Sequence, residues 1–318
     1  MAMVTNSVTS YGTPTKREDL INAIYRIDPE DTPFSNSIPR VKATAVLHEW
    51  SKQALGSVNT TNAHLEGDVT DRAASTTPTR AQNYCQISKK NATVSGTERS
   101  INIAGINDML DYQKSLKSVE LRKDMEAILL GNTGQAAGAT NVARTLRSFN
   151  AWFAGNASRG TGGADSTAAT AAATDGNTTN GLRTFDETLL KAAVKSAYDD
   201  GGKPTRIFLG SGNKQIFSGF TGRANSRQDI NNPDKILASA SIYGSDFGDL
   251  MVIPNRTQRA RDVFVVDTSK VALAGLRMFE QNELGRIGDA DTVELISEYT
   301  LEMRHENAHA GVMDTSAT

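Results

Sequence analysis

The segment from Asn107 to Leu130 predicts one long amphipathic helix, and this helix limits how the rest of the chain can be arranged. Its apolar side chains recur mostly three to five residues apart, as a one-sided helical stripe requires. They are Ile106, Met109, Leu110, Leu116, Leu121, Met125, Ile128 and Leu129. Asn107 is placed to cap the first turn, and Gly131 to supply the left-handed residue that closes many helices. At 1.5 Å per residue the helix is about 35 Å long, which predicts a spine on which other elements pack.

The segment Thr292–His305 predicts a strand of similar reach, because apolar and polar residues alternate along it. Val293, Leu295, Tyr299, Leu301 and Met303 are expected on one face, and Glu294, Glu298, Glu302 and Arg304 on the other. Only Ile296 and Ser297 interrupt the pattern. Such a strand is about 40 Å long, twice the usual length.

The overall composition excludes several classes of protein. With 318 residues the chain can form two domains or one large domain with extensions. A net charge of −2 argues against a nucleic-acid or membrane binder held by bulk positive charge. Cys85 is the only cysteine, so no intramolecular disulfide or cysteine-rich metal site can form. The N-terminus lacks the pattern of a signal peptide and no run of eighteen apolar residues occurs, so synthesis in the cytoplasm is expected.

The first 95 residues read as extended segments with little core of their own. A short helix is predicted at Arg17–Arg26, and Pro29 and Pro33 end it. Strand character appears at Ile38–Leu55 and again at Arg80–Val94, with a polar stretch between them. These segments predict a long two-stranded hairpin, which is marginal alone in water and must lie against something larger.

The region after the long helix predicts a loop followed by a compact α/β module. Residues 141–153 present several large apolar side chains, whereas residues 154–181 are rich in Gly, Ala and Thr and are expected to form a flexible surface loop. Thr184 and Glu187 have capping-box spacing before an amphipathic helix that ends near Gly201. Strands are then predicted at Thr205–Leu209, Leu250–Ile253, Val263–Val266 and Val271–Leu273, with a helix from Ser211.

One motif suggests a metal site. His305, Glu306 and His309 satisfy the H-E-x-x-H pattern of zinc hydrolases, which works only when both histidines share a face of a helix. Here the preceding residues have the period of a strand, in which positions i and i+4 lie about 13 Å apart. Gly311 follows at once, and Asp314 is the only downstream acid that could serve as a third ligand. A continuing strand or a turn is therefore expected, with no metal.

The other candidate motifs favour ordinary structural roles. Residues 209–214 lack the Gly-Lys-Ser/Thr ending and the spacing of a phosphate-binding loop, and predict a strand-to-helix turn. Residues 289–291 lack the ligand series of a calcium loop. His48 and His64 stand alone, and no nucleophile has an identifiable base partner. The sequence therefore predicts no catalytic, cofactor-binding or metal-binding residue, and a protein that is not an enzyme.

The order of parts, together with short motifs at both ends, resembles the major capsid proteins of tailed bacteriophages. The motifs are Asp31-Thr32-Pro33-Phe34, residues 38–44, His48-Glu49-Trp50, residues 298–302 and residues 307–311. The resemblance covers nearly the whole chain, and residues 154–181 are the least similar part. It implies an α+β fold with an N-terminal arm, an extended loop, a peripheral domain with a spine helix and long terminal strand, and an axial α/β domain.

The resemblance also implies domain boundaries and an assembly. The boundaries are 1–37 for the arm, 38–95 for the extended loop hairpin, 96–153 and 275–318 for the peripheral domain, 154–181 for the flexible loop and 182–274 for the axial domain. Copies are expected to form hexamers and pentamers of an icosahedral head around double-stranded DNA. The implied location is the virion, after synthesis in the host bacterial cytoplasm.

The implied partners are other copies of the chain, a portal, non-specifically packaged DNA, no membrane, and a decoration protein in some relatives. No charged N-terminal coiled coil is present, so a separate scaffolding protein is expected. Some relatives form lysine-to-asparagine cross-links. Lys52, Lys89 and Lys90 lie in the candidate loop, but no partner asparagine can be identified. Two alternatives stay open: a zinc-dependent hydrolase using His305, Glu306 and His309, and a cellular nanocompartment shell of the same fold.

Overall fold

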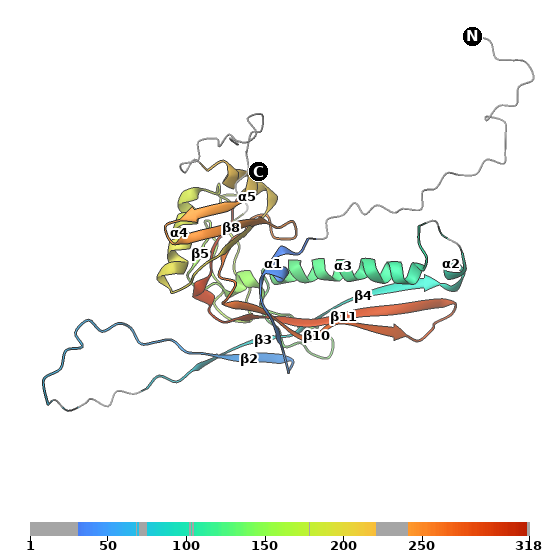
Figure 1. Cartoon of the computed structure of the whole chain (residues 1–318), viewed down its shortest axis with the longest axis horizontal. Helices are drawn as coiled ribbons and strands as arrows, with labels where there is room; N and C mark the ends of the chain where they lie inside the picture. Colours follow the sequence, from blue (N-terminus) through green and yellow to red (C-terminus); the bar gives the residue numbers. More distant parts are fainter. Residues whose placement is uncertain are drawn as a thin grey trace, which may run out of the picture.

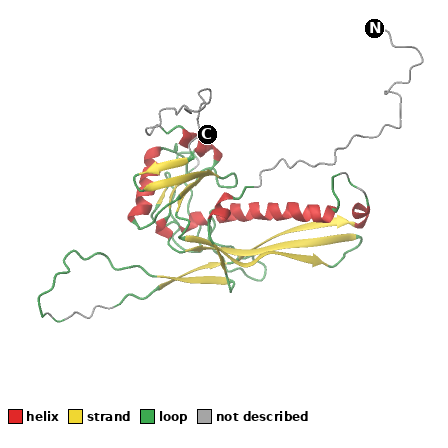
Figure 2. Cartoon of the chain, in the orientation of Figure 1, coloured by secondary structure: helices red, strands yellow, loops and turns green. Residues whose placement is uncertain are grey.

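Helix α3 (Met109–Leu129) lies along a four-stranded sheet and forms with it the long body of the molecule (Figure 1). The computed structural model describes residues 31–67, 69, 75–101, 103, 105–177, 179–220 and 241–316. The strand order is β1-β10-β11-β4, and α3 packs chiefly on β4 (Gln86–Ser95) and β11 (Ala290–Met303). The predicted spine helix is confirmed, and the mixture of helices and strands in Figure 2 agrees with the expected α+β class.

Both predicted caps of this helix are wrong. Asp108, not Asn107, is the N-cap, and its carboxylate accepts hydrogen bonds from the backbone N–H groups of Leu110 and Asp111. A carboxylate there also suits the positive end of the helix dipole. At the other end Gly131 is not left-handed, because the last turn tightens so that the Gly131 N–H reaches the Ile128 carbonyl at 3.2 Å.

The predicted long terminal strand is confirmed as β11, which has 14 residues. Its partner β10 (Val271–Leu284) is equally long, although only Val271–Leu273 was predicted as strand. Register shifts on either side of Arg277, and a positive φ of 53° at Phe279, break the alternation that would have revealed it. The polar face of β11 is also not solvated near its end, since Glu298 is 3% exposed and pairs with Arg144 and Arg277.

The predicted hairpin is shorter than residues 38–95. Strands β2 (Leu47–Lys52) and β3 (Thr79–Tyr84) pair with each other and run away from the body toward a long loop (Figure 1). The predicted strand Ile38–Leu55 is in fact two strands, because β1 (Arg40–Lys42) pairs in parallel with β10. The second predicted strand is also divided, since the chain leaves the hairpin at buried Cys85 and continues as β4 in the main sheet.

The compact module is a six-stranded sheet with two helices on one face. Its order is β5-β12-β9-β6-β8-β7, and α4 (Glu187–Asp199) and α5 (Ser211–Ser218) cover one side. The strands are β5 (Ala157–Ser158), β6 (Arg206–Leu209), β7 (Ile242–Ser245), β8 (Gly248–Pro254), β9 (Val263–Val266) and β12 (Ala310–Val312). Helix α4 begins one residue after Asp186, whose side chain accepts the Thr188 N–H, so the predicted capping box at Thr184 is wrong.

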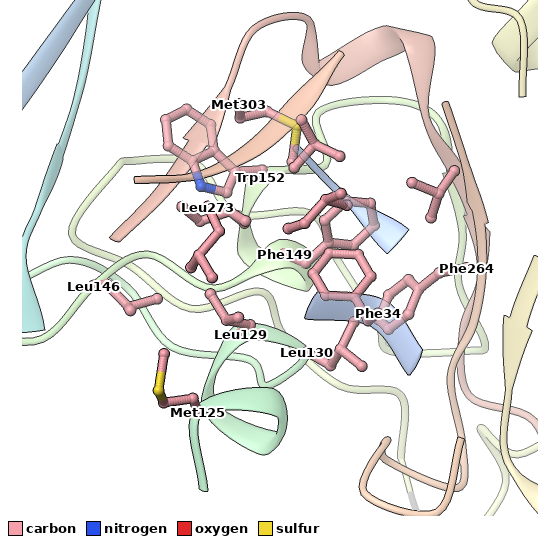
Figure 3. Packing of buried hydrophobic residues seen from close by; sticks show 14 of the residues in the cluster. Phe34, Met125, Leu129, Leu130, Leu146, Phe149, Trp152, Phe264, Leu273 and Met303 are labelled. Carbon is pink, nitrogen blue, oxygen red and sulfur yellow. The ribbon is translucent and has the colours of Figure 1, made fainter. Parts of the chain in front are cut away.

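The main core lies where the two bodies meet. Phe149, in the short 3-10 turn Phe149–Trp152, makes edge-to-face ring contacts with Phe34 at 5.5 Å and with Phe264 at 5.1 Å between centroids. Figure 3 shows these rings beside Leu129 and Leu130 at the end of α3. Phe34 comes from α1 (Pro33–Ser37), so one cluster joins the start of the described chain, the spine helix and the compact module.

Within residues 154–177 and 179–181, expected to form a flexible surface loop, polar side chains of other segments contact the backbone. Asn132 donates to the Ala173 carbonyl at 2.7 Å and accepts from the Ala173 N–H at 2.9 Å. Arg261 donates to the Gly176 carbonyl at 2.8 Å. The expectation considered apolar burial alone, whereas polar side chains from neighbouring elements hold this segment.

The predicted helix Arg17–Arg26 lies outside the described residues. Within the described part of the chain, no helix has both the length and the apolar character needed to cross a bilayer.

Candidate assembly surfaces

In the His305-Glu306-Asn307-Ala308-His309 motif, the two histidines and the glutamate each contact a different part of the protein. The motif lies in a turn after β11, with Glu306–Ala308 as a single 3-10 turn, as the turn prediction stated. His305 Nε2 lies 3.1 Å from the Asp200 carbonyl, and Glu306 pairs with Lys52 at 2.6 Å. His309 is buried, and its Nδ1 accepts the Asp267 N–H at 3.1 Å. Across the described ranges, no three His, Cys, Asp or Glu side chains are grouped so that they could hold a metal ion.

His309 has a predicted effect on acid stability. Burial lowers its pKa from 6.5 to about 4, so the folded protein keeps the ring neutral while the unfolded chain takes up a proton below 6.5. The contribution of this residue to stability is therefore present above pH 6.5 and is lost as pH falls toward 4, at about 1.4 kcal/mol per pH unit. The test is urea unfolding between pH 4.5 and 7. In His309→Gln, whose side-chain oxygen can still accept the Asp267 N–H, the free energy of unfolding should change less with pH than in wild type. His64→Gln, at an exposed position, is the matched control. If His309→Gln depends on pH as wild type does, the assignment is contradicted.

The remaining motif candidates have structural roles. Residues 209–214 form the predicted turn from β6 into α5. Asp291, at the start of β11, pairs with Arg99 at 2.5 Å and with Arg286 at 2.7 Å. His48 lies 2.9 Å from Glu302. The two cross-link candidates on β4 are also paired, Lys89 with Glu294 at 3.1 Å and Lys90 with Asp124 at 2.8 Å.

The loop of the hairpin leaves several large apolar side chains uncovered. Leu55, Val58 and Leu65 are 97%, 92% and 82% exposed. Residues 53–67 contain no helix or strand. Monomeric proteins rarely leave several large apolar side chains of one segment in water, and such exposure marks an interaction site.

The base of the hairpin, in contrast, is firmly attached to the body. Trp50 donates from Nε1 to the Met303 carbonyl at 2.9 Å, and Asn83 donates to the Leu301 carbonyl at 2.9 Å. The Trp50 ring also packs on Trp152, with 5.8 Å between centroids. Together with the Lys52–Glu306 pair, these contacts fix the direction of the hairpin while leaving its loop free to contact another molecule.

The opposite end of the long body carries a second exposed apolar group. Ile287, in the turn between β10 and β11, is 89% exposed, and Leu284 and Ile101 beside this end are about half exposed. Beside them, Asp291 of β11 forms ion pairs with both Arg99 and Arg286. Because Arg99 lies in helix α2 (Gly96–Ser100), its pair with Asp291 attaches this helix to the end of the sheet. Exposed apolar side chains therefore occur at both ends of the molecule, in the hairpin loop at one end and in the turn between β10 and β11 at the other.

A buried carboxylate that sequence reasoning missed joins three segments. Glu126, on α3, accepts the backbone N–H groups of Phe34 at 2.7 Å and Ser35 at 2.8 Å, and the Asn255 side-chain amide at 2.7 Å. Burial raises the pKa of Glu126, and the hydrogen bonds from Ser35 and Phe34 oppose that shift. In the sequence, the only sign of this role is an acidic residue next to Met125 on the apolar side of the helix. The groups that donate to Glu126 could not be found locally, because they lie about 90 residues before it and 129 residues after it.

Comparisons with known proteins point to one family. Residues 4–316 match the sequence model of a family described as SU10 major capsid protein. The major capsid protein of Escherichia phage Phieco32 is 32% identical over 127 residues, which are 40% of this chain and 36% of that protein. The alignment therefore spans about a third of that relative's length.

Solved structures share the fold across nearly the whole chain. The cyanophage A-1(L) capsid asymmetric unit has a TM-score of 0.68 at 14% identity, covering 96% of this chain and 99% of that chain. The holo-SrpI encapsulin complex of Synechococcus elongatus PCC 7942 has a TM-score of 0.54 at 9% identity, covering 95% and 93%. At these identities the likeness establishes the fold alone.

Proposed function

The chain belongs to the SU10 major capsid protein family, and from this membership we propose that it builds the icosahedral head of a tailed phage. Hexamers and pentamers of the chain form the wall of the head, and double-stranded DNA fills it. The protein has a structural role, and its copies associate by burying surface against one another. Its place is the virion.

The observation that carries this proposal is the supported hairpin with an uncovered loop. Its base is fixed by buried contacts from Trp50 and Asn83, yet Leu55, Val58 and Leu65 are exposed. A segment of this kind gains apolar burial only on another molecule, and a closed shell supplies the same contact to every copy.

The parts of the proposed shell subunit follow the expected domains, with changed limits. We assign the compact module to the axial domain around residues 182–274, completed by β5 and β12 from outside that range. The peripheral domain takes residues 96–153 and 275–318, and also β4, which belongs to its sheet and not to the extended loop.

The proposed partners follow from the family. Portal and separate scaffolding proteins act with this chain during assembly, and a decoration protein suits the outer surface. DNA is packaged without sequence recognition, because a chain with net charge −2 neither holds nor strongly repels it. The encapsulin likeness keeps a nanocompartment shell as a second candidate, and the phage family match favours the head.

Electron microscopy of the expressed protein tests the proposal. We expect closed, regular shells when the chain is produced with the scaffolding protein of its phage, and irregular particles when it is produced alone. Regular shells from the chain alone contradict the separate scaffold, and enzyme cargo in place of DNA and tails identifies a nanocompartment. A protomer that stays monomeric at high concentration, with residues 53–67 protected from protease, contradicts shell assembly altogether.

A further inference from the structure

The four-stranded sheet has a long edge that the described strands leave mostly uncovered. Strand β1 pairs with β10 only along Leu273–Gly275. Within the described part of the chain, residues 276–284 of β10 therefore have no partner strand on that side. An open edge presents unpaired backbone N–H and C=O groups, to which a strand of another molecule can pair. A regular edge of this length would let the sheets of two protomers join.

Two bulges interrupt this edge just where β1 ends. Gly275 pairs with Tyr299 of β11. Five residues further along β10, Glu280 pairs with Ile296, which is only three residues from Tyr299. Strand β10 therefore contains two extra residues, one on each side of Arg277. Each extra residue bends the strand and moves its outward N–H and C=O groups away from the regular spacing that a partner strand needs.

The second bulge has a strained backbone that its neighbours hold in place. Phe279 has a φ of 53°, a left-handed conformation that is rare for a bulky side chain. The guanidinium of Arg122 on α3 lies over its ring, 5.4 Å from the centroid. Met278 covers Gly275 so closely that a Cβ added at Gly275 would collide with the Met278 side chain. Strain that packing maintains inside a strand indicates that this geometry has a role.

An ion pair offers a different reason for the bulges. The first extra residue reverses the alternation of side chains, so Arg277 lies on the same face as Glu298 and pairs with it at 3.0 Å. In a strand without bulges, however, the residue directly after Gly275 would stand opposite Glu298. An arginine at that position would make the same contact. The ion pair therefore does not require the bulges.

Beyond the bulges, acidic side chains occupy the rest of the edge. From Glu280 to Leu284 the pairing with β11 is regular again, so this run still offers evenly spaced backbone groups. It contains Glu280 and Glu283 but no basic residue, and both glutamates are exposed. Arg277 lies 3.8 Å from Glu280 but is shared with Glu298, so it offsets this charge only in part. Two copies of the run placed side by side therefore repel each other.

The opposite edge of the same sheet is protected by charge alone. Strand β4 keeps one register with β11 along its whole length. It carries Lys89 and Lys90, and lysine is a common residue on edges that must not pair. Lys90 also reaches Asp124 of α3 at 2.8 Å. Both edges of the sheet therefore carry features that oppose pairing, and on β10 these features include the backbone itself.

We propose that residues 276–283 of β10, with their two bulges and two glutamates, form an edge guard that keeps the sheets of two protomers from pairing in solution. The partner that the edge guard excludes is β10 of a second copy. Identical edges meet about a two-fold axis, so each copy would present the same irregular backbone and the same glutamates to the other. This inference concerns the free protomer and goes beyond shell assembly.

Deleting Leu276 and Phe279 together tests the bulges. The deletion removes both extra residues and leaves Arg277 opposite Glu298. It also keeps the two faces of the outer run, because an even shift preserves the alternation. At a dilution where wild type is monomeric, sedimentation velocity should show this variant as dimers or larger species. Hydrogen exchange should show the backbone amides of residues 280–284 protected only in the associated form.

Phe279→Gly is the matched control for the deletion. It removes the same ring and tolerates the positive φ, but it keeps both bulges, so it should stay monomeric. A deletion variant that unfolds cooperatively in urea and yet stays monomeric overturns the proposal. Equal association of Phe279→Gly also overturns it, because loss of the ring and not a regular edge would then be the cause.

Glu280→Gln with Glu283→Gln tests the glutamates without changing the backbone. Removing two like charges from each copy should lower the dissociation constant for self-association about tenfold. Glu66→Gln with Asp111→Asn removes the same charge at exposed positions outside β10 and should leave the constant unchanged. An unchanged constant in the Glu280 and Glu283 variant overturns the edge guard, and this variant decides the question if the deletion variant does not fold. None of these measurements requires the chain to form shells, so the two proposals can fail separately.

Discussion

Replacing Glu126 with glutamine is expected to lower the free energy of unfolding by about 3 kcal/mol, because three buried donors then lose their common anionic acceptor. The Phe34 N–H, the Ser35 N–H and the Asn255 amide all donate to this carboxylate. Glutamine keeps one acceptor oxygen and turns an N–H₂ group toward a donor. Relief of the buried charge offsets part of the loss, since burial raises the pKa of Glu126.

Urea unfolding of the variant and of a matched control decides this prediction. Glu120→Gln removes a carboxylate from the same helix, where it pairs with Lys117 on the surface, and should change stability by no more than about 0.5 kcal/mol. Glu126→Asp should behave like Glu126→Gln, because the shorter side chain cannot reach all three donors. A Glu126→Gln protein as stable as wild type would show that the cost of burying the charge equals the value of its hydrogen bonds.

Long-range contacts such as these separate what the sequence predicts from what it does not. Helix α3 and strand β11 were predictable because each is long and its apolar residues recur with a regular period, a pattern that neighbouring residues alone reveal. The position of Glu126 gave a hint, but no local pattern identifies backbone donors at Phe34 and Ser35. In the same way, the sequence placed Glu298 only on the polar face of its strand, and could not show that Arg144 and Arg277 from two other segments pair with it.

Strand boundaries failed for a related reason. Residues 38–55 alternate in part, and nothing in that pattern reveals that β1 pairs with β10 while β2 pairs with β3. The partner decides where a strand ends. The apolar residues of the hairpin loop were no clearer, because Leu55 and Val58 look like interior residues until the structure shows nothing beside them.

The hairpin loop is where we expect the largest effect on assembly. Changing Leu55, Val58 and Leu65 together to serine should leave unfolding of the protomer unchanged, because these side chains are at least 82% exposed in it. In the proposed shell each is buried on a neighbouring copy, worth at least about 1.5 kcal/mol. Their combined loss weakens each contact by about three orders of magnitude.

Because every copy in a shell repeats the same contact, a loss of this size at one contact should prevent closed particles at concentrations where wild type assembles. Sedimentation and electron microscopy measure particle yield, and urea unfolding of the monomer measures protomer stability. Ala54→Ser with Thr60→Ser alters the same loop without removing large apolar surface, and should assemble as wild type does.

Normal particle yield from the triple variant means that this loop does not bury its apolar residues on a neighbour. A destabilised monomer means that those residues already have partners within their own chain. Loss of particles with an intact monomer is the result that only contact between copies explains.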